Sequence, residues 1–248
     1  MSTKALILSS ILVTIPVFIS YKDKLDLGKD IIFSMIRAII QLIIVGFLLD
    51  YIFGLENPIY TIALVLLMIF NAALNTKKKE DEIDNQLLIS FISILIGTSI
   101  TMIVLILSKA IKFTPSEVIP VAGMVVSNSM VALSLSYNNL LSTYKNNRTA
   151  VEVKLSLGAD IKDASKDIIR DSIKISIMPS IDSAKTLGIV SLPGMMTGLI
   201  LGGTSPLIAV KFQIMVTFMI LSSTSLSVMI ATYLSYKKFF NDRKQIKI

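Results

Sequence analysis

Long apolar runs separated by short polar connections make up most of this 248-residue chain. A helix needs about 20 mainly apolar residues to cross roughly 30 Å of membrane hydrocarbon. The pattern therefore predicts an all-α, polytopic membrane protein with about seven transmembrane helices, of which the first and the third are short. The expected spans are residues 4–20, 31–53, 59–74, 87–108, 118–137, 180–201 and 207–235. We expect them to form a single transmembrane domain over residues 1–248.

The first apolar run has a second interpretation as a cleaved signal peptide. Such a peptide ends at a cleavage site made of small residues. Here the run continues directly into YKDKLDLGKD, residues 21–30, without such a site. We therefore interpret residues 4–20 as a span that is retained.

The distribution of Lys and Arg predicts the orientation of the spans. The connections 21–30, 75–86 and 138–179 and the tail after residue 235 together carry eighteen basic residues, whereas the opposite side carries three. Cytoplasmic connections of membrane proteins are enriched in Lys and Arg. The N-terminus is therefore expected outside and the C-terminus inside the cell membrane, with the long connection 138–179 in the cytoplasm.

Composition supports the membrane assignment and narrows the chemistry. Hydrophobic residues make up 53% of the chain and charged residues 17%, against roughly 45–50% and about 25% in soluble domains. The mean hydropathy is +0.75. Basic cytoplasmic connections explain the net charge of +7, so no nucleic-acid partner is expected.

Because the chain has no Cys and no His, thiol nucleophiles, histidine bases and Cys/His metal sites are excluded. We expect no catalytic residues and no enzyme activity.

The longest polar segment is EVKLSLGADIKDASKDIIRDSIK, residues 152–174. The pattern predicts a short helical turn that Gly158 ends in a left-handed conformation. A second helix would start at Asp160 as its N-cap and reach the next span at Pro179. Its mostly apolar face would consist of Ile161, Ala164, Ile168, Ser172 and Ile175.

This segment has two interpretations. It is either an amphipathic helix that rests on lipid headgroups or a docking element for a cytosolic partner. Glu152 precedes Gly158 by six residues, a spacing that resembles the E-A-A-x-x-x-G coupling loop of ABC-transporter permeases, although Val153 and Lys154 replace the two alanines. In those proteins the loop sits in a groove of the ATPase subunit. The residues expected to couple to an ATPase are Glu152, Leu155, Leu157, Gly158 and Ala159.

Longer runs across the chain resemble the FetB-type permease family. They are RAIIQLIIVG (37–46), NAALNTKKK (71–79), IPVAGMVVSNSMVALSLSYNNL (119–140), EVKLSLGA (152–159), IRDSIKISIMPSIDSAKTLGIVSLPGMMTGLI (169–200) and KFQIMVTFMILSSTSLS (211–227). The resemblance covers nearly the whole chain and implies the permease subunit of an ABC transporter for iron export. Related plant proteins are tied to aluminium tolerance and to movement of UDP-glucose. The resemblance also favours docking as the role of residues 152–174.

A cytosolic ABC ATPase is the partner that this resemblance implies, with ATP and Mg²⁺ bound there. The chain itself has no G-x-x-x-x-G-K-[ST] phosphate-binding loop, so we expect no cofactor in it. Seven spans are few for a complete pore, which favours a homodimer. The family implies iron or another metal as cargo, and the residues that would bind metal are unknown.

Three other functions remain open on the sequence. One is a secondary transporter driven by an ion gradient, and another is an ABC permease for a nucleotide-sugar such as UDP-glucose. The third is a membrane scaffold or receptor that transports nothing.

Three charged residues lie within or at the edge of expected spans. Charges inside a bilayer cost several kcal/mol unless they are paired or hydrated. Asp182 and Lys185 stand three residues apart on one helical face, and Asp182 is the acidic residue nearest in depth to Arg37. These residues are candidate intramembrane charge pairs. Alternatively, Asp182 and Lys185 extend to the membrane interface.

A polar and thioether stripe follows one side of the span 118–137. Met124, Ser127, Asn128 and Ser134 recur there at helical spacing. Amide and hydroxyl oxygen and Met sulfur are the weak metal ligands that the span offers. We therefore consider these four residues a candidate translocation path, with hydrogen bonding between helices as the alternative.

Gly194, Gly198 and Gly202 are spaced by four residues. Small residues at this spacing let helix backbones approach closely in membranes. We expect helix packing at these glycines, and a kink at Pro193 immediately before them.

Overall fold

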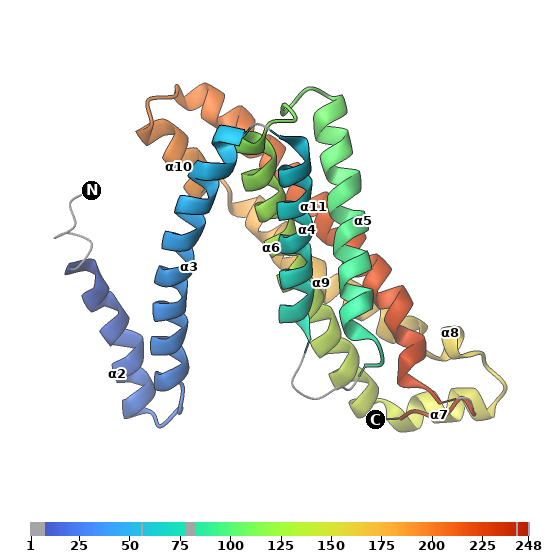
Figure 1. Ribbon diagram of the computed structural model, residues 1–248. Coiled ribbons are helices and arrows are strands. Elements are labelled where there is room, and N and C mark those ends of the chain that lie inside the picture. The colour runs from blue at the N-terminus through green and yellow to red at the C-terminus, as the bar shows by residue number, and fades with distance from the viewer. Residues whose placement is uncertain (1–7, 56, 78–82, 242, 248) are drawn as a thin grey trace. The chain divides into compact units, whose positions relative to one another are not determined.

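The computed structural model describes residues 8–55, 57–77, 83–241 and 243–247. Throughout these ranges the regular structure is helical, apart from two isolated β-bridges (Figure 1). The predicted all-α fold is therefore confirmed. The chain divides into two compact units, residues 1–56 and 57–248, and each is described by itself.

The first unit contains η1 (Ser10–Val13), α2 (Thr14–Lys22) and α3 (Gly28–Leu55). In the turn between α2 and α3, the Ser20 hydroxyl accepts a hydrogen bond from the Leu27 amide at 3.0 Å. Most large apolar side chains of α3 are exposed. An apolar surface of this kind is expected on a helix that lipid or another chain covers.

The second unit holds the longer part of the chain. Its elements are α4 (Pro58–Thr76), α5 (Gln86–Leu107), α6 (Pro115–Asn146), α7 (Arg148–Ser156), α8 (Ile161–Ala164), α9 (Lys166–Thr186), α10 (Gly194–Leu201), α11 (Pro206–Ser235) and η2 (Tyr236–Phe239). Helix α6 lies against α4, α5, α9 and α11. Along the chain α4, α5, α6, α9 and α11 run in alternating directions (Figure 1). We call the two ends of this bundle the α7 end and the α10 end.

Proline residues mark where three of the long helices begin. Pro58, Pro115 and Pro206 each occupy the first turn of a helix. The amide of a residue at this position has no partner within the helix, so proline is tolerated there and its fixed φ favours the helix. At α4 the preceding Asn57 also caps the helix, since its side-chain oxygen accepts from the Ile59 amide at 2.9 Å.

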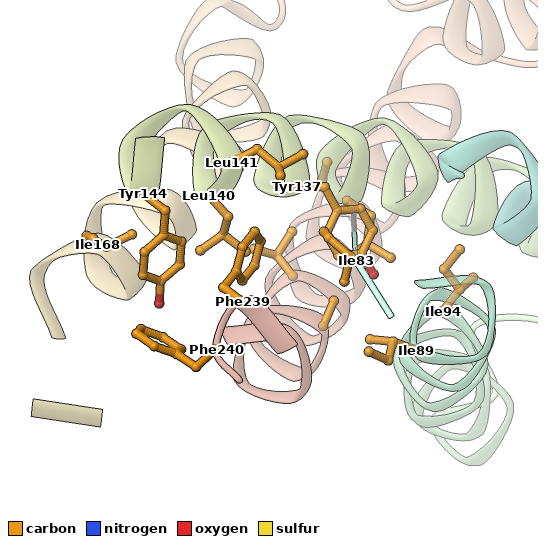
Figure 2. Close-up of a cluster of buried hydrophobic side chains, with 14 of the residues drawn as sticks. Ile83, Ile89, Ile94, Tyr137, Leu140, Leu141, Tyr144, Ile168, Phe239 and Phe240 are labelled. Atoms are coloured by element: carbon orange, nitrogen blue, oxygen red, sulfur yellow. The ribbon is translucent and has the colours of Figure 1, made fainter. Parts of the chain in front are cut away.

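A cluster of buried side chains fills the α7 end of the bundle (Figure 2). The Tyr144 ring stacks on Phe239 with ring centroids 4.7 Å apart and meets Phe240 edge-on at 5.6 Å. Nearby, the hydroxyls of Tyr137 and Ser90 lie 2.9 Å apart. The ring contacts attach the C-terminal segment to the end of α6, and the hydroxyl contact joins α6 to α5.

Small hydroxyl residues join α6 to α11 inside the bundle. The hydroxyls of Ser129 and Ser223 are 2.8 Å apart, and those of Ser136 and Thr232 are 2.9 Å apart. Hydrogen bonds of this kind hold helices together where no hydrophobic driving force acts between them.

Five helices among the described residues are long and apolar enough to cross a membrane. They are Gly28–Gly54, Pro58–Thr76, Gln86–Leu107, Pro115–Asn146 and Pro206–Phe239, and each coincides with an expected span. The expected span 4–20 corresponds to a shorter apolar segment, Ser10–Lys22, and residues 4–7 lie outside the described residues. The total of seven spans and their orientation therefore stay predictions.

The expected continuous span over residues 180–201 is wrong. Helix α9 ends at Thr186, and the chain is not helical again until α10. Gly188 in the connection has a φ of +82°, and Pro193 has no amide hydrogen to continue a helix. The helix that runs along α6 and α11 is α9 (Figure 1), which continues through Pro179, where we had expected a junction.

Candidate functional site

A cavity of about 360 Å³ lies between α6, α9, α10 and α11. Side-chain amides and hydroxyls from three helices form its polar lining. These residues are Asn128 of α6, Ser176, Ser180 and Ser183 of α9, and Gln213 and Thr217 of α11. Met124 and Met195 add thioether sulfur. None of the described lining residues carries a charge, so the cavity offers neutral oxygen and sulfur donors.

Two of the four residues in the predicted polar stripe of α6 line this cavity. Met124 and Asn128 line it, and the Asn128 amide group donates to the Met124 carbonyl at 2.8 Å. Ser127 and Ser134 are not among the described lining residues. Their hydroxyls donate to carbonyls of their own helix, at 3.2 Å and 3.0 Å. A lining role for Met124 and Asn128 stays a prediction that this geometry supports.

The sequence reasoning missed the polar lining from α9 and α11. The signal was present, since Ser176, Ser180 and Ser183 follow one another at intervals of four and three residues. Gln213 and Thr217 are also one turn apart, and the Thr217 hydroxyl donates to the Gln213 carbonyl at 2.8 Å. The side-chain oxygen of Gln213 is buried without a hydrogen-bond partner among the described residues. Gln213 therefore brings an unsatisfied polar group to the cavity wall.

A second cavity of about 470 Å³ lies between α6 and α9, nearer the α7 end. Its polar lining residues are Asn139, Thr143, Asp171, Lys174 and Asp182. Pro179 of α9 lines both cavities. From the α7 end along α6 and α9, the cavity with charged lining residues therefore comes first, and the cavity with neutral polar lining residues follows it.

The predicted charged residues fall in both units. Asp182 and Lys185 form an ion pair of 2.9 Å with exposed side chains, and such a pair contributes at most about 1 kcal/mol to stability. Asp182 also faces the second cavity. Arg37 lies on α3 in the first unit, so its pairing with Asp182 stays a prediction.

Carboxylate clusters that could hold a metal ion do not occur among the described residues. The oxygen and sulfur donors around the first cavity are neutral, and such donors bind divalent metals weakly. This donor set suits a passing cargo better than a resident metal.

The expected coupling segment, residues 138–179, contains a helix, a left-handed turn and a second short helix. Helix α7 is followed by Gly158 with a φ of +91°, as the sequence predicts. Asp160 takes the N-cap position of α8, but its side chain makes no capping hydrogen bond among the described residues. Its carboxylate instead pairs with Lys244 at 3.2 Å.

Exposure divides the predicted coupling residues into two groups. Leu157 is 83% exposed and Val153, on the same side of α7, is 52% exposed. Leu155 and Ala159 instead pack against the buried cluster of the bundle. Glu152 makes an ion pair of 3.0 Å with Arg148. The apolar groups that a partner can reach are therefore Val153 and Leu157, while Leu155 supports the segment from within.

The C-terminal segment packs against the coupling segment. Phe240 and Ile246 are buried in the same cluster as Val151 of α7. Lys247 forms an ion pair of 3.0 Å with Asp84, before α5. Because Lys244 also forms an ion pair with Asp160, the C-terminal segment connects the coupling segment to the bundle.

The predicted packing glycines do not meet a neighbouring helix among the described residues. A Cβ built at Gly194 or Gly198 would have no described atom within 4 Å, and one at Gly202 would meet carbonyls of the preceding helical turn. Their packing role stays a prediction.

Gly97 of α5 does mediate close packing. A Cβ there would overlap the Ser227 hydroxyl and would lie 3.1 Å from the Ser223 carbonyl oxygen. Ser93, Gly97 and Thr101 are spaced by four residues and are all buried. This small-residue pattern was the sequence signal for the packing of α5 on α11.

Five apolar helices of membrane length among the described residues, two of which line the polar cavity, define a multi-pass membrane protein. The chain matches the family described as "Uncharacterised protein family (UPF0014)" over residues 3–240. The chain belongs to this family.

Three relatives match the chain over nearly its whole length. It is 51% identical to "Probable iron export permease protein FetB" of Escherichia coli over 247 residues, which cover 100% of this chain and 95% of that protein. It is 36% identical to "Protein ALUMINUM SENSITIVE 3" of Arabidopsis thaliana, with 96% and 87% covered. It is 37% identical to "UPF0014 membrane protein YjkA" of Bacillus subtilis, with 98% and 97% covered. The predicted resemblance is confirmed. No solved structure matches the chain.

Proposed function

We propose that this chain is the membrane-spanning permease subunit of an ATP-driven exporter of iron or another metal. The observation that carries the proposal is the 51% identity with the Escherichia coli permease FetB over the whole chain. Because the sequence contains no phosphate-binding loop, ATP and Mg²⁺ would bind to a separate cytosolic ABC ATPase. The chain itself would transport without catalysing a covalent step.

The coupling segment supplies the contact with that ATPase in this proposal. Leu157 is 83% exposed, and Val153 lies one turn away. Apolar side chains that stand out from a polar surface fit a groove on a partner. A homodimer of this chain would present two such segments to two ATPase subunits.

Helix α9 provides a direct connection between the coupling segment and the cavity. A single residue, Ser165, separates α8 from α9. The same α9 brings Ser176, Ser180 and Ser183 to the cavity wall. Movement of the coupling segment on the ATPase would therefore move one wall of the path, which is the rigid-body transmission typical of transporters.

The two cavities suit successive stages of cation passage. Asp171 and Asp182 beside the second cavity would attract a cation. The neutral donors of the first cavity would replace part of its hydration shell without holding it tightly. Conduction requires binding strong enough for entry and weak enough for release, and this order of charged and then neutral walls meets both conditions.

The proposal is tested by iron efflux from cells loaded with Fe²⁺. The ATPase is first identified by its co-purification with this chain, and efflux is then compared for the chain alone, the ATPase alone and both together. We expect efflux above background only when both are present. Equal efflux from the chain alone, abolished by an uncoupler, would support an ion-gradient transporter, for which the Asp182–Lys185 pair is the candidate coupling charge.

A further inference from the structure

A third cavity at the α7 end is lined by basic side chains. It has a volume of about 280 Å³ and lies between α8, α9 and α11. Its lining residues are Lys162, Lys166, Ile169, Arg170, Ile173 and Tyr233. The three basic residues follow one another at intervals of four along the chain, and none of the described lining residues is acidic. This cavity takes no part in the proposed transport path.

The basic residues of this cavity differ from other lysines near the same end. Lys154, Lys244 and Lys247 each pair with an aspartate at 3.0–3.2 Å. Lys162, Lys166 and Arg170 are exposed, and they make no hydrogen bond or ion pair with the described residues. Their combined positive charge is therefore available to an anion.

The position of Tyr233 places this cavity at the depth of lipid headgroups. Tyr233 lies less than two helical turns before the end of the candidate span Pro206–Phe239. Tyr is enriched at membrane interfaces, where its ring meets the acyl region and its hydroxyl meets water. One turn deeper on the same side of α11, Met229 is 53% exposed. Ile169 and Ile173 supply the apolar floor of the cavity.

We propose that this cavity binds the headgroup of an anionic phospholipid. The phosphodiester would lie among Lys162, Lys166 and Arg170, and the acyl chains would follow the exposed side of α11 past Met229. Basic pockets between membrane helices at the cytoplasmic side bind anionic headgroups in this way. The bound lipid would hold the start of α9 against α11.

The test uses the purified full-length protein and native mass spectrometry with added phosphatidylglycerol or phosphatidylcholine of identical acyl chains. The variant is K166Q/R170Q, which keeps a polar side chain at both positions but removes two charges. The control is K109Q/K112Q, which removes the same charge at two exposed residues of the connection between α5 and α6, outside the cavity. Each basic group near an anionic surface contributes roughly a factor of five in affinity.

We expect the parent and the control to prefer phosphatidylglycerol, and the variant to bind it about 25-fold more weakly. Three results would overturn the proposal. The variant could bind phosphatidylglycerol like the parent, or the parent could bind phosphatidylcholine equally well. Deacylated glycerophosphoglycerol could also displace the lipid completely, which would indicate a site for soluble phosphates. If the first of these results is found and the variant also captures less of the ATPase, an acidic protein surface occupies the site instead of a lipid.

Discussion

Gly158 matters through its backbone, because its φ is +91° and no described atom lies within 4 Å of a Cβ built there. A side chain at this position has room, so the cost of adding one is conformational. A β-branched residue in the left-handed region costs at least about 1 kcal/mol. That strain would redirect Leu157 and the turn after α7, while Val151 and Leu155 keep the rest of α7 in the buried cluster.

We therefore predict that Gly158→Val uncouples the chain from its ATPase. Co-purification of the ATPase should fall, or ATP hydrolysis should continue without transport, while the permease still folds and purifies. Gly158→Asn is the matched control, since Asn adopts the left-handed conformation more readily. A Gly158→Val variant that binds its ATPase and transports like the parent would show that the coupling assignment is wrong.

Asn128 is the residue of α6 whose replacement should affect transport most. Asn128→Leu removes an amide from the cavity wall, and the loss of one hydrogen-bonding group of about 1 kcal/mol predicts roughly fivefold slower efflux. Ser127→Leu is the control, because Ser127 is the residue before Asn128 on the same helix and its side chain is exposed. Val126 would be a poor control, since it is buried in the core at 4% exposure. Equal loss of efflux in both variants would show that the side of α6 that faces the cavity has no special role in transport.

At the residue scale, the left-handed conformation predicted for Gly158 is observed, and two of the four residues in the predicted α6 stripe, Met124 and Asn128, line a cavity. The other two, Ser127 and Ser134, could not be separated from them by spacing alone. Polar residues at helical spacing spread over a wide sector of the helix, and only the neighbouring helices decide which part of that sector faces a cavity. Hydroxyls in the remaining sector bond to their own helix.

Among the elements, α9 departs most from the expectation. The pattern of apolar residues predicts a span at 180–201 and not at 166–186, because the charged residues of 166–185 lower the mean hydropathy of the second range. In the folded unit most of those charged residues line the second cavity or the basic cavity, while Ile168, Ser172 and Ser176 are buried. A helix that lines aqueous space need not be apolar, so hydropathy alone could not locate it.

The contact between α5 and α11 gives a prediction on stability. Gly97→Ala introduces a Cβ that would overlap the Ser227 hydroxyl, and forced packing of this kind costs about 1–3 kcal/mol. We expect a lower melting temperature of the purified protein. Gly46→Ala is the control, because no described atom lies within 4 Å of its Cβ position and Ala favours a helix over Gly. An unchanged melting temperature for Gly97→Ala would mean that the two helices are not in close contact.

For the whole molecule, orientation in the membrane rests on the eighteen-to-three distribution of basic residues. The chain has no natural cysteine, so a single introduced thiol reports on one position. Asn147 lies in the exposed connection between α6 and α7. We predict that Asn147→Cys is labelled by a membrane-impermeant thiol reagent only after lysis of the cells. Labelling in intact cells would place the α7 end outside and would reverse the orientation.

ATP-dependent transport by this chain and its ATPase is the central claim, and reconstitution tests it most directly. The measurement is Fe²⁺ movement across proteoliposomes that contain both subunits, with ATP, with a non-hydrolysable ATP analogue, or with an uncoupler. We predict movement with ATP, none with the analogue, and no effect of the uncoupler, together with slower movement in the Asn128→Leu variant. Movement that continues without ATP and stops with the uncoupler would contradict this prediction.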